Sequence, residues 1–474
     1  MRVKRGSSRR SWAIGALVVA GLLGGLPAPA AHAAGETVPM DFNGDGYRDA
    51  VLRVPAAKVA GRADAGAVIV LYGSPSGLSA KRRAFLTQNS PGVPDTAETG
   101  DYFGASTASA DLDRDGYADL VIGAPYENLS FGADKGAVTI LWGSRSGLVS
   151  GRLLPTPRDF DMFGRDVTAA GKGTSSTSLV TVGGWNFTQT FNGPFTRARG
   201  ATSSARGMDM WFGSVTAGDL NRDGRADTVA VSGRVSSGGH VFVNAEQTTE
   251  WGDYLKTGDA LVATVGDVNG DGYGDIVAGD PDEPERRGVD GERGGRVLIW
   301  YGGPSGVPVD AVPVVISQDS SGVPDTGETY DRFGASVAVA DFDRDGVGDI
   351  AVGAPGEKAG TVRRAGTVTL IPGRRTGVPG VGAYLYSQET VGVPSAGEAD
   401  DQFGTNISAG DVNRDGRPEM LVSAVGENGY AGAVWVLPGG AVRPAGSGSQ
   451  VFTTSLFGLP AQGYQLLGGD SLPQ

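Results

Sequence analysis

An acidic loop of nine residues occurs six times in this chain of 474 residues. Positions 1, 3, 5 and 9 are Asp, Asn or Glu in every copy, position 2 is apolar, and position 6 is Gly. The copies read DFNGDGYRD (41–49), DLDRDGYAD (111–119), DLNRDGRAD (219–227), DVNGDGYGD (267–275), DFDRDGVGD (341–349) and DVNRDGRPE (411–419). Oxygen-bearing side chains at this regular spacing indicate a cation site.

The chemistry of the loop favours Ca²⁺, which takes about six to eight oxygen ligands. Side chains at positions 1, 3 and 5 supply one arc, and Gly at position 6 permits the positive φ of a sharp bend. The position 7 carbonyl and the position 9 carboxylate then complete the shell. Mg²⁺ prefers rigid octahedral geometry and zinc prefers Cys or His, so neither fits as well. The predicted ligands are Asp41, Asn43, Asp45, Tyr47, Asp49; Asp111, Asp113, Asp115, Tyr117, Asp119; Asp219, Asn221, Asp223, Arg225, Asp227; Asp267, Asn269, Asp271, Tyr273, Asp275; Asp341, Asp343, Asp345, Val347, Asp349; and Asp411, Asn413, Asp415, Arg417, Glu419.

Two other interpretations of the loops are less consistent with the sequence. Clusters of Asp, Asn and Gly form turns without any metal, but turns alone do not require the same acidic positions in six copies. An EF-hand needs a Glu at position 12 and flanking helices. Position 12 is apolar here, as Leu52 and Ile122 illustrate, and a short β-type run follows each loop. The loops are therefore predicted to connect strands.

The first 33 residues have the pattern of a signal peptide. Five basic residues among the first ten precede the apolar stretch 12–26, and Ala31-His32-Ala33 fits a small-x-small cleavage site. About 15 apolar residues are too few to span a membrane comfortably. The pair Arg9-Arg10 leaves both general secretory and twin-arginine export open. The sequence thus predicts a signal peptide at 1–33, a secreted, extracellular protein, and no membrane insertion after cleavage.

The net charge of the chain bears on the classes of function that are possible. Cleavage of the predicted signal peptide would remove its five basic residues and change the net charge from −13 to −18. The six loops contain 20 carboxylates. Six Ca²⁺ ions would leave about −6, so metal sites account for much of the acidity. Nucleic-acid binding is not expected, because it requires a basic patch. There are no cysteines, hence no disulfide framework, and the 79 glycines suit many tight turns.

The elements around the loops also repeat in order. A Phe-Gly pair stands upstream, as at 103–104, 333–334 and 403–404, and a strand of small residues leads into the loop. The apolar strand after the loop ends in Gly-Ala-Pro at 123–125 and 353–355, and a Gly-initiated β-type run follows. The loops that begin at 111 and 219 are separated by 108 residues, and this interval holds a degenerate copy after Phe163-Gly164. Its loop has Gly171, Gly173 and Ser175 where acids belong, so it should not bind calcium. The count of repeats is then seven.

These motifs resemble the FG-GAP repeat family, and the chain is similar to the seven-bladed β-propeller at the N-terminus of integrin alpha subunits. The resemblance implies an all-β, seven-bladed β-propeller of four-stranded blades over residues 34–474, with Ca²⁺ in such loops at one face. In integrins the opposite face binds partners. No inserted ligand-binding domain is evident, so integrin ligand specificity is not carried over.

Closure of the ring is predicted to involve the C-terminal tail. The first loop begins too soon after residue 33 for a Phe-Gly strand of its own, and the segment 464–469 could supply the missing strand of the first blade. A closed ring protects strand edges that an open array would expose.

Three inserts that begin with Gln and contain Gly-Val-Pro, at 88–94, 318–324 and 388–394, could form a binding rim, although packing on the blade is favoured. Aromatic residues lie around the degenerate unit and are also expected to pack rather than bind. They are Trp185, Phe187, Phe191, Phe195 and Trp211. Trp142, Trp300 and Trp435 lie in apolar strands and are predicted to be core residues between blades.

Two functional hypotheses remain. The favoured one is a monomeric, non-catalytic binding or adhesion module for an unidentified protein or glycan. The alternative is a secreted enzyme acting on glycans or phosphodiesters on the same scaffold. His240 is the one histidine after residue 33, and no Gly-x-Ser-x-Gly elbow is present, which weakens the enzyme hypothesis.

Overall fold

Short apolar runs bounded by glycine become strands in the structure, which is a computed structural model. It describes residues 38–171, 178–185, 187–198, 200–201, 203–209, 212–233, 239–244, 254–284, 290–377 and 379–469. The runs that follow the acidic loops are buried along their whole length, as in Asp119–Ala124 and Asp349–Ala354. Alternation is absent from these strands because both faces of each sheet are covered by neighbouring sheets.

Seven antiparallel sheets, numbered here as blades in chain order, make up the fold. Blades 1 to 3 are β1 (Ala50–Val54), β2 (Ala67–Leu71), β3 (Arg83–Leu86); β4 (Ser106–Ala110), β5 (Asp119–Ala124), β6 (Ala137–Trp142), β7 (Ser150–Leu153); and β8 (Asp166–Ala170), β9 (Leu179–Gly183), β10 (Phe187–Asn192), β11 (Ser203–Asp209). Blades 4 and 5 are β12 (Phe212–Gly218), β13 (Asp227–Ser232), β14 (Val241–Val243); and β15 (Val262–Gly266), β16 (Asp275–Asp280), β17 (Arg296–Trp300), β18 (Val314–Ile316). Blades 6 and 7 are β19 (Ser336–Ala340), β20 (Asp349–Ala354), β21 (Thr367–Ile371), β22 (Tyr384–Tyr386); and β23 (Phe403–Gly410), β24 (Glu419–Ala424), β25 (Ala433–Leu437), β26 (Gln450–Thr453).

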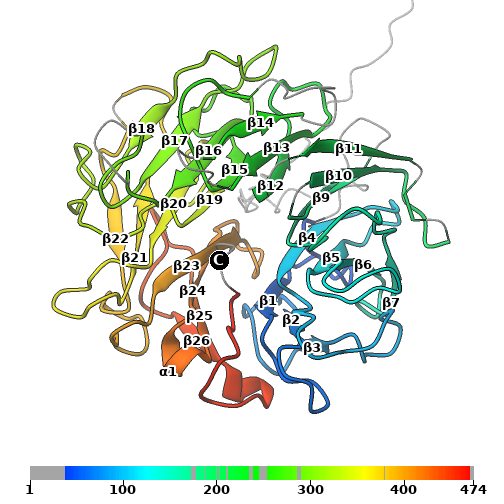
Figure 1. The fold of residues 1–474 in the computed structure, drawn as a ribbon. Coiled ribbons are helices and arrows are strands. Elements are labelled where there is room, and N and C mark those ends of the chain that lie inside the picture. Colours follow the sequence, from blue (N-terminus) through cyan, green and yellow to red (C-terminus); the bar gives the residue numbers. More distant parts are fainter. Residues whose placement is uncertain are drawn as a thin grey trace, which may run out of the picture. The chain divides into compact units, whose positions relative to one another are not determined.

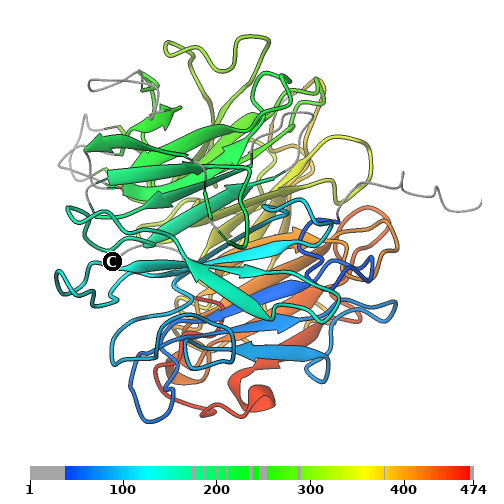
Figure 2. The ribbon, with the colours of Figure 1, turned by 90° about the vertical axis from the view of Figure 1, so that its right-hand side faces the viewer.

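The blades of the unit 37–474 stand around a central axis as a seven-bladed β-propeller, as predicted (Figure 1). The first strands of successive blades are neighbours in space: β1 and β4, β4 and β8, β8 and β12, β12 and β15, β15 and β19, and β19 and β23. In the edge view the sheets are stacked with their strands running between two faces (Figure 2). Among the described residues, helical structure is limited to α1 (Glu427–Tyr430) and the 3₁₀ turn Thr454–Phe457.

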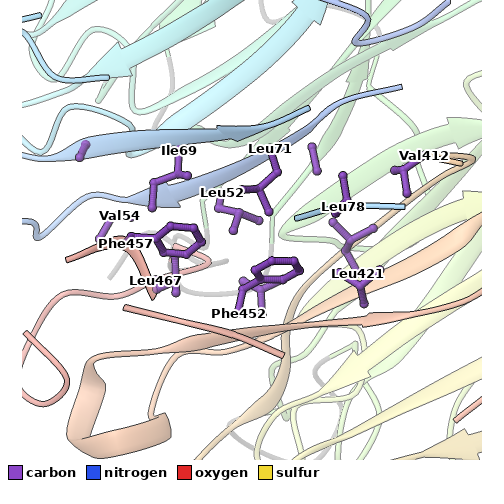
Figure 3. Close-up of a cluster of buried hydrophobic side chains, with 14 of the residues drawn as sticks. Leu52, Val54, Ile69, Leu71, Leu78, Val412, Leu421, Phe452, Phe457 and Leu467 are labelled. Atoms are coloured by element: carbon purple, nitrogen blue, oxygen red, sulfur yellow. The ribbon is translucent and has the colours of Figure 1, made fainter. Parts of the chain in front are cut away.

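Blade 1 packs against blade 7, which brings the two ends of the repeat array together. Leu52 of β1 and Ile69 of β2 share one buried cluster with Leu421 of β24 and Phe452 of β26 (Figure 3). Burial of apolar area of this kind is the main favourable term in folding. The same packing recurs between other blades. Trp142, Trp300 and Trp435 are at most 1% exposed and lie in clusters shared by two blades, so their prediction as core residues between blades is confirmed.

The C-terminal tail lies between the first and last blades. The backbone N–H of Gly468 donates to the carbonyl of Arg53 on β1, and the Asn406 side chain on β23 donates to the carbonyls of Gly468 and Gly469. Residues 464–469 form no strand, however, and blade 1 has three strands among the described residues. The predicted role of the tail as a latch that completes blade 1 stays a prediction.

Blade 4 also has three strands in the part of the chain that the structure describes. The predicted signal peptide lies outside the described residues, as do residues 172–177 of the degenerate loop, which include Gly173 and Ser175. Across the described ranges, no helix has the length and apolar character that crossing a membrane requires.

Candidate functional site

The six acidic loops occupy equivalent positions in the blades. The loop 111–119 joins β4 to β5, and the other loops stand in the same way before β1, β13, β16, β20 and β24. They are therefore all at the same end of their strands. The loops also touch one another around the ring. The N–H at position 8 of a loop donates to the carbonyl of the position 1 Asp in the preceding blade for Ala118 and Asp41, for Gly274 and Asp219, and for Gly348 and Asp267.

The position 1 carboxylate holds the bend of each loop. Asp41 Oδ2 accepts the backbone N–H of Gly46 at 2.8 Å, and the equivalent bond is present in all six copies. The position 6 glycine has a positive φ in every copy, between 79° and 93°, as predicted from its sequence. Position 4 is left-handed as well, even where it is an arginine, as in Arg114. Left-handed backbone costs a residue with a Cβ about 1–2 kcal/mol, so the four loops with Arg at position 4 hold a conformation that this residue disfavours.

The position 5 side chain also accepts a backbone hydrogen bond. Its Oδ1 receives the N–H of position 7 in all six loops, over 2.8–3.1 Å. These are Asx turns. They fix the direction of each carboxylate and leave its second oxygen for another partner.

The position 9 carboxylate ties the loop to its own sheet, and it is buried in every copy except the loop 219–227, where Asp227 is partly exposed. Asp119 is fully buried; its Oδ2 accepts the N–H of Leu112 at 2.9 Å and its Oδ1 accepts the N–H of Gly143 at 2.9 Å. Gly143 directly follows β6, so the bond spans from the loop to the third strand. The first of these bonds is present in all six loops, and the second recurs at Asp49, Asp275 and Asp349. Each oxygen retains a lone pair.

Burial raises the pKa of five of these carboxyl groups, those of Asp49, Asp119, Asp275, Asp349 and Glu419. The pKa of Asp119 is raised to about 8 and that of Asp49 to about 7, chiefly by loss of water and further by the other acids of each loop. The bonds from backbone N–H groups oppose this rise. A divalent cation bound in the loop would displace this proton, because its positive charge offsets the cost of a buried negative charge.

Two loops bring three carboxylates together closely enough for one ion. Oxygens of Asp111, Asp113 and Asp115 lie within 4.8 Å of one another, and so do those of Asp341, Asp343 and Asp349. In the first of these loops, Asp111 Oδ1 and Asp113 Oδ1 are buried without a hydrogen-bond partner. Buried oxygens without partners are costly, and a bound cation would relieve that cost. The donor set contains only oxygen, which fits Ca²⁺.

The side chain of Arg197 already contacts two of the predicted ligands in the loop 111–119. Arg197 Nε lies 2.9 Å from Asp113 Oδ2, and its guanidinium also contacts Asp115 and the carbonyl of Gly143. The side chain is 42% exposed, so the ion pair is only partly protected from water. A positive charge thus already faces the carboxylates that would otherwise repel one another.

The structure therefore brings positions 1, 3, 5 and 9 of each loop into one short turn. The assignment of ligands, including the position 7 carbonyls, stays a prediction. Sequence reasoning missed the left-handed position 4, the second bond of position 9 and the approach of Arg197. None of these has a local sequence signal, apart from the choice of Gly or Arg at position 4.

A central cavity of about 880 Å³ runs along the axis between the inner strands. Its lining includes Arg48 and Val412 near the acidic loops and Tyr102, Tyr126 and Tyr464 near the other ends of the strands. The rings of Tyr102 and Tyr126 are 5.3 Å apart, and Tyr126 and Tyr464 are 36% and 50% exposed. Solvent-exposed tyrosines beside a cavity can stack on sugars or pack against a protein.

The other sequence candidates are mostly packed. Val323 and Val393 of the Gly-Val-Pro inserts are 9% exposed and belong to hydrophobic clusters, which confirms packing on the blade for these two copies. Phe191 and Phe195 are at most 2% exposed. Arg165 lies over the ring of Trp185, and Phe187 packs against the cluster around Phe191, while Trp211 lies outside the described residues.

His240 gives little support for catalysis. Its ring stacks on that of Tyr254 with centroids 4.4 Å apart, and Nδ1 is 3.9 Å from Asp259 Oδ1. That separation exceeds hydrogen-bonding distance.

Comparison with known proteins agrees with the repeat pattern. The model described as "FG-GAP repeat" matches residues 37–71, 103–141, 261–300, 333–371 and 403–437. These segments are parts of blades 1, 2, 5, 6 and 7, and they include five of the six acidic loops.

Curated relatives share shorter stretches. The chain is 33% identical over 173 residues to phosphatidylinositol-glycan-specific phospholipase D of Bos taurus, covering 36% of this chain and 19% of that protein. It is 30% identical over 239 residues to integrin alpha-V of Gallus gallus, covering 47% and 21% respectively. The chain thus spans only about a fifth of the length of these relatives. Among solved structures, the Dos1 propeller aligns with a TM-score of 0.40 and 11% identity, over 75% of this chain and 69% of its own.

Proposed function

We propose, from the premise that this chain carries FG-GAP repeats in a seven-bladed propeller, that it is a secreted calcium-binding protein whose propeller acts as a non-catalytic binding or adhesion module. About six Ca²⁺ ions would occupy the acidic loops and hold one face of the propeller together. The opposite face would receive a protein or glycan ligand. Secretion rests on the signal-peptide pattern of residues 1–33.

The observation that carries the calcium part is the common scaffold of the loops. Each position 1 carboxylate already closes the bend, and in the loop 111–119 two buried oxygens have no hydrogen-bond partner. The loops are linked by backbone bonds from blade to blade, such as Ala118 to Asp41. Ions in such loops would stiffen the contacts between blades, which is a structural use of calcium.

The observation that supports binding is the group of tyrosines at the mouth of the central cavity. Tyr102, Tyr126 and Tyr464 line the cavity at the ends of the strands away from the acidic loops. Tyrosine offers a large apolar ring and one polar atom at little cost in side-chain entropy, which suits recognition of sugars and of protein surfaces.

A glycan array and a pull-down with extracellular proteins would test this part of the proposal. Tyr126→Ala should weaken capture of any ligand found, since it removes a ring beside the cavity. Tyr301→Ala is the matched control, because Tyr301 is 40% exposed but follows β17 at the loop end of blade 5. Equal loss of capture in both variants would contradict the assigned face.

The second candidate function is an enzyme acting on phosphodiesters or glycans. The similarity to a phosphatidylinositol-glycan-specific phospholipase D favours a phosphodiester substrate, although it covers 19% of that protein. A screen with phosphodiester and polysaccharide substrates would decide between the two. Turnover that is abolished by one carboxylate substitution at the cavity, such as Asp166→Asn, would replace the binding module with an enzyme.

A further inference from the structure

A second set of carboxylates repeats at the end of the strands away from the acidic loops. Asp119 begins β5 and Glu127 follows its end, so the two groups lie at opposite ends of this strand. In the first copy, oxygens of Glu98, Asp101 and Glu127 lie within 4.8 Å of one another. The second copy has the same arrangement in Glu328, Asp331 and Glu357. The third consists of Glu398, Asp401 and Glu427.

Each copy stands where one blade passes to the next. Asp101 lies on the segment between β3 of blade 1 and β4 of blade 2, whereas Glu127 lies on the connection from β5 to β6 of blade 2 (Figure 1). The other two copies join blade 5 to blade 6 and blade 6 to blade 7 in the same way. A ligand held there would bind residues from two connections at once.

A buried glutamine completes each copy. Nε2 of Gln88, Gln318 and Gln388 donates to Glu127, Glu357 and Glu427 respectively, over 2.5–3.0 Å. These glutamines are 1–3% exposed, yet the Oε1 atom of each has no hydrogen-bond partner. In the first copy, Asp101 Oδ1 is likewise buried without a partner. A buried amide oxygen that lacks a partner destabilises the folded protein, so the presence of such an oxygen in all three copies requires an explanation.

The hydrogen bonds in the cluster orient the rest of the ligand set. Asp101 Oδ2 accepts the backbone N–H of Glu98, and Asp331 and Asp401 make the equivalent bond to Glu328 and Glu398. This bond fixes the aspartate, and in the first copy it leaves Oδ1 of Asp101 buried without a partner. A half-turn of the glutamine amide would exchange Nε2 for Oε1 against the carboxylates. Without a cation that exchange would be repulsive, and with one it would add a neutral oxygen ligand.

We propose that these three clusters are a second set of calcium sites, each formed by a Gln amide oxygen, a buried Asp and a buried Glu, with a less buried Glu at the rim. The ligand set contains only oxygen and carries up to three negative charges, which suits Ca²⁺. The cation would satisfy the unpartnered oxygens and offset the repulsion between the carboxylates. It would also join consecutive blades at the face that the acidic loops leave unsupported.

Calcium counting by native mass spectrometry of the full protein tests the proposal. The expected count is about nine ions, six in the loops and three in the clusters. Asp101→Asn should lower the count by one, because the amide nitrogen would face the cation. Asp310→Asn is the matched control, since Asp310 is exposed, and it should not change the count. Asp115→Ala should independently remove one loop ion.

The outcomes separate this proposal from the loop sites. A count of about six that Asp101→Asn leaves unchanged would contradict calcium binding in the clusters and support it in the loops. No bound calcium at all would contradict both sets of sites. Gln88→Glu provides a second variant if Asp101→Asn does not fold. It adds a charged ligand, and calcium affinity rises with ligand charge, so the half-saturating calcium concentration of one site should fall. A site lost or unchanged in Gln88→Glu would also contradict the proposal.

Discussion

The carboxylate of Asp119 accepts a hydrogen bond from the backbone N–H of Gly143 at 2.9 Å, so the last residue of an acidic loop holds the end of the third strand of its blade. The same carboxylate accepts the N–H of Leu112 within the loop. Position 9 therefore has two possible roles, as a structural acceptor and as a metal ligand. The other ligands of this loop lie closer to the surface, and the two roles can be separated by substitution.

Asp119→Ala should destabilise the protein even without calcium. Two buried backbone N–H groups would lose a carboxylate partner, at a cost of about 1–3 kcal/mol for each. Asp115→Ala should lower the melting temperature mainly when calcium is present, because Asp115 is 34% exposed and its loss chiefly removes a ligand. Denaturation in chelator and in calcium measures both variants. Ser175→Ala, in the degenerate loop, should match the parent protein; an Asp119→Ala curve in chelator identical to the parent would rule out the structural role.

Calcium removal should lower the stability of the whole propeller. Extracellular sites of this kind bind with dissociation constants of about 10⁻⁴–10⁻³ M. At ten times the dissociation constant each site adds about 1.4 kcal/mol, so six independent sites would add about 8 kcal/mol. This equals the net stability of many whole domains. Calorimetry in calcium and in chelator measures the difference, and superimposable melting curves would contradict calcium binding in the loops.

Arg197→Gln should strengthen calcium binding to the loop 111–119. The guanidinium competes with the cation for Asp113 and Asp115, so its removal should lower the half-saturating metal concentration. Tb³⁺ luminescence excited through Tyr117, in the same loop, reports on this site, and Tyr117→Phe identifies that part of the signal. Arg145→Gln is the control of equal charge change at an exposed neighbouring position. Weaker binding in Arg197→Gln would mean that the arginine supports the site instead of competing for it.

Leu467→Ala should test the predicted latch. Leu467 is fully buried in the cluster that blade 1 shares with blade 7 (Figure 3). Truncation of a buried leucine costs about 2–5 kcal/mol, and urea denaturation would detect it. Leu456→Ala, at a leucine that is 47% exposed, should change stability by about 0.5 kcal/mol or less. Equal stability of the two variants would show that the tail does not close the ring.

The sequence predicted the repeating parts of this molecule and missed the contacts between them. The loops, the strands after them and the seven blades follow from local patterns that recur at fixed spacing. Gln88 and Glu127 are 39 positions apart, and Arg197 is 84 positions from Asp113. Such pairs meet only after the blades have packed, so a linear pattern does not reveal them. The Gly-Val-Pro inserts recur visibly in the sequence, but nothing in the sequence pairs their glutamines with glutamates on another connection.

Asp166 should make stability depend on pH between about 4 and 6. Its carboxylate accepts the backbone N–H groups of Val167 on β8 and Val215 in the next blade, and burial is the main cause that raises its pKa from 3.8 to about 6. The folded protein therefore keeps a proton that the unfolded chain releases. The resulting stabilisation is fully present below pH 3.8 and is lost as pH rises through about 6.

The size of this effect is at most about 3 kcal/mol, and Asp166→Asn isolates it. Asparagine resembles the neutral acid and does not ionise, so the loss of a good acceptor should shift its stability by a similar amount at every pH. The stability of the parent protein relative to the variant should therefore fall between pH 4 and pH 6 and then level off. Urea denaturation of both proteins across this range measures the difference. A constant difference would mean that Asp166 is ionised in the folded protein throughout, because Arg53, which opposes the rise of its pKa, then outweighs burial.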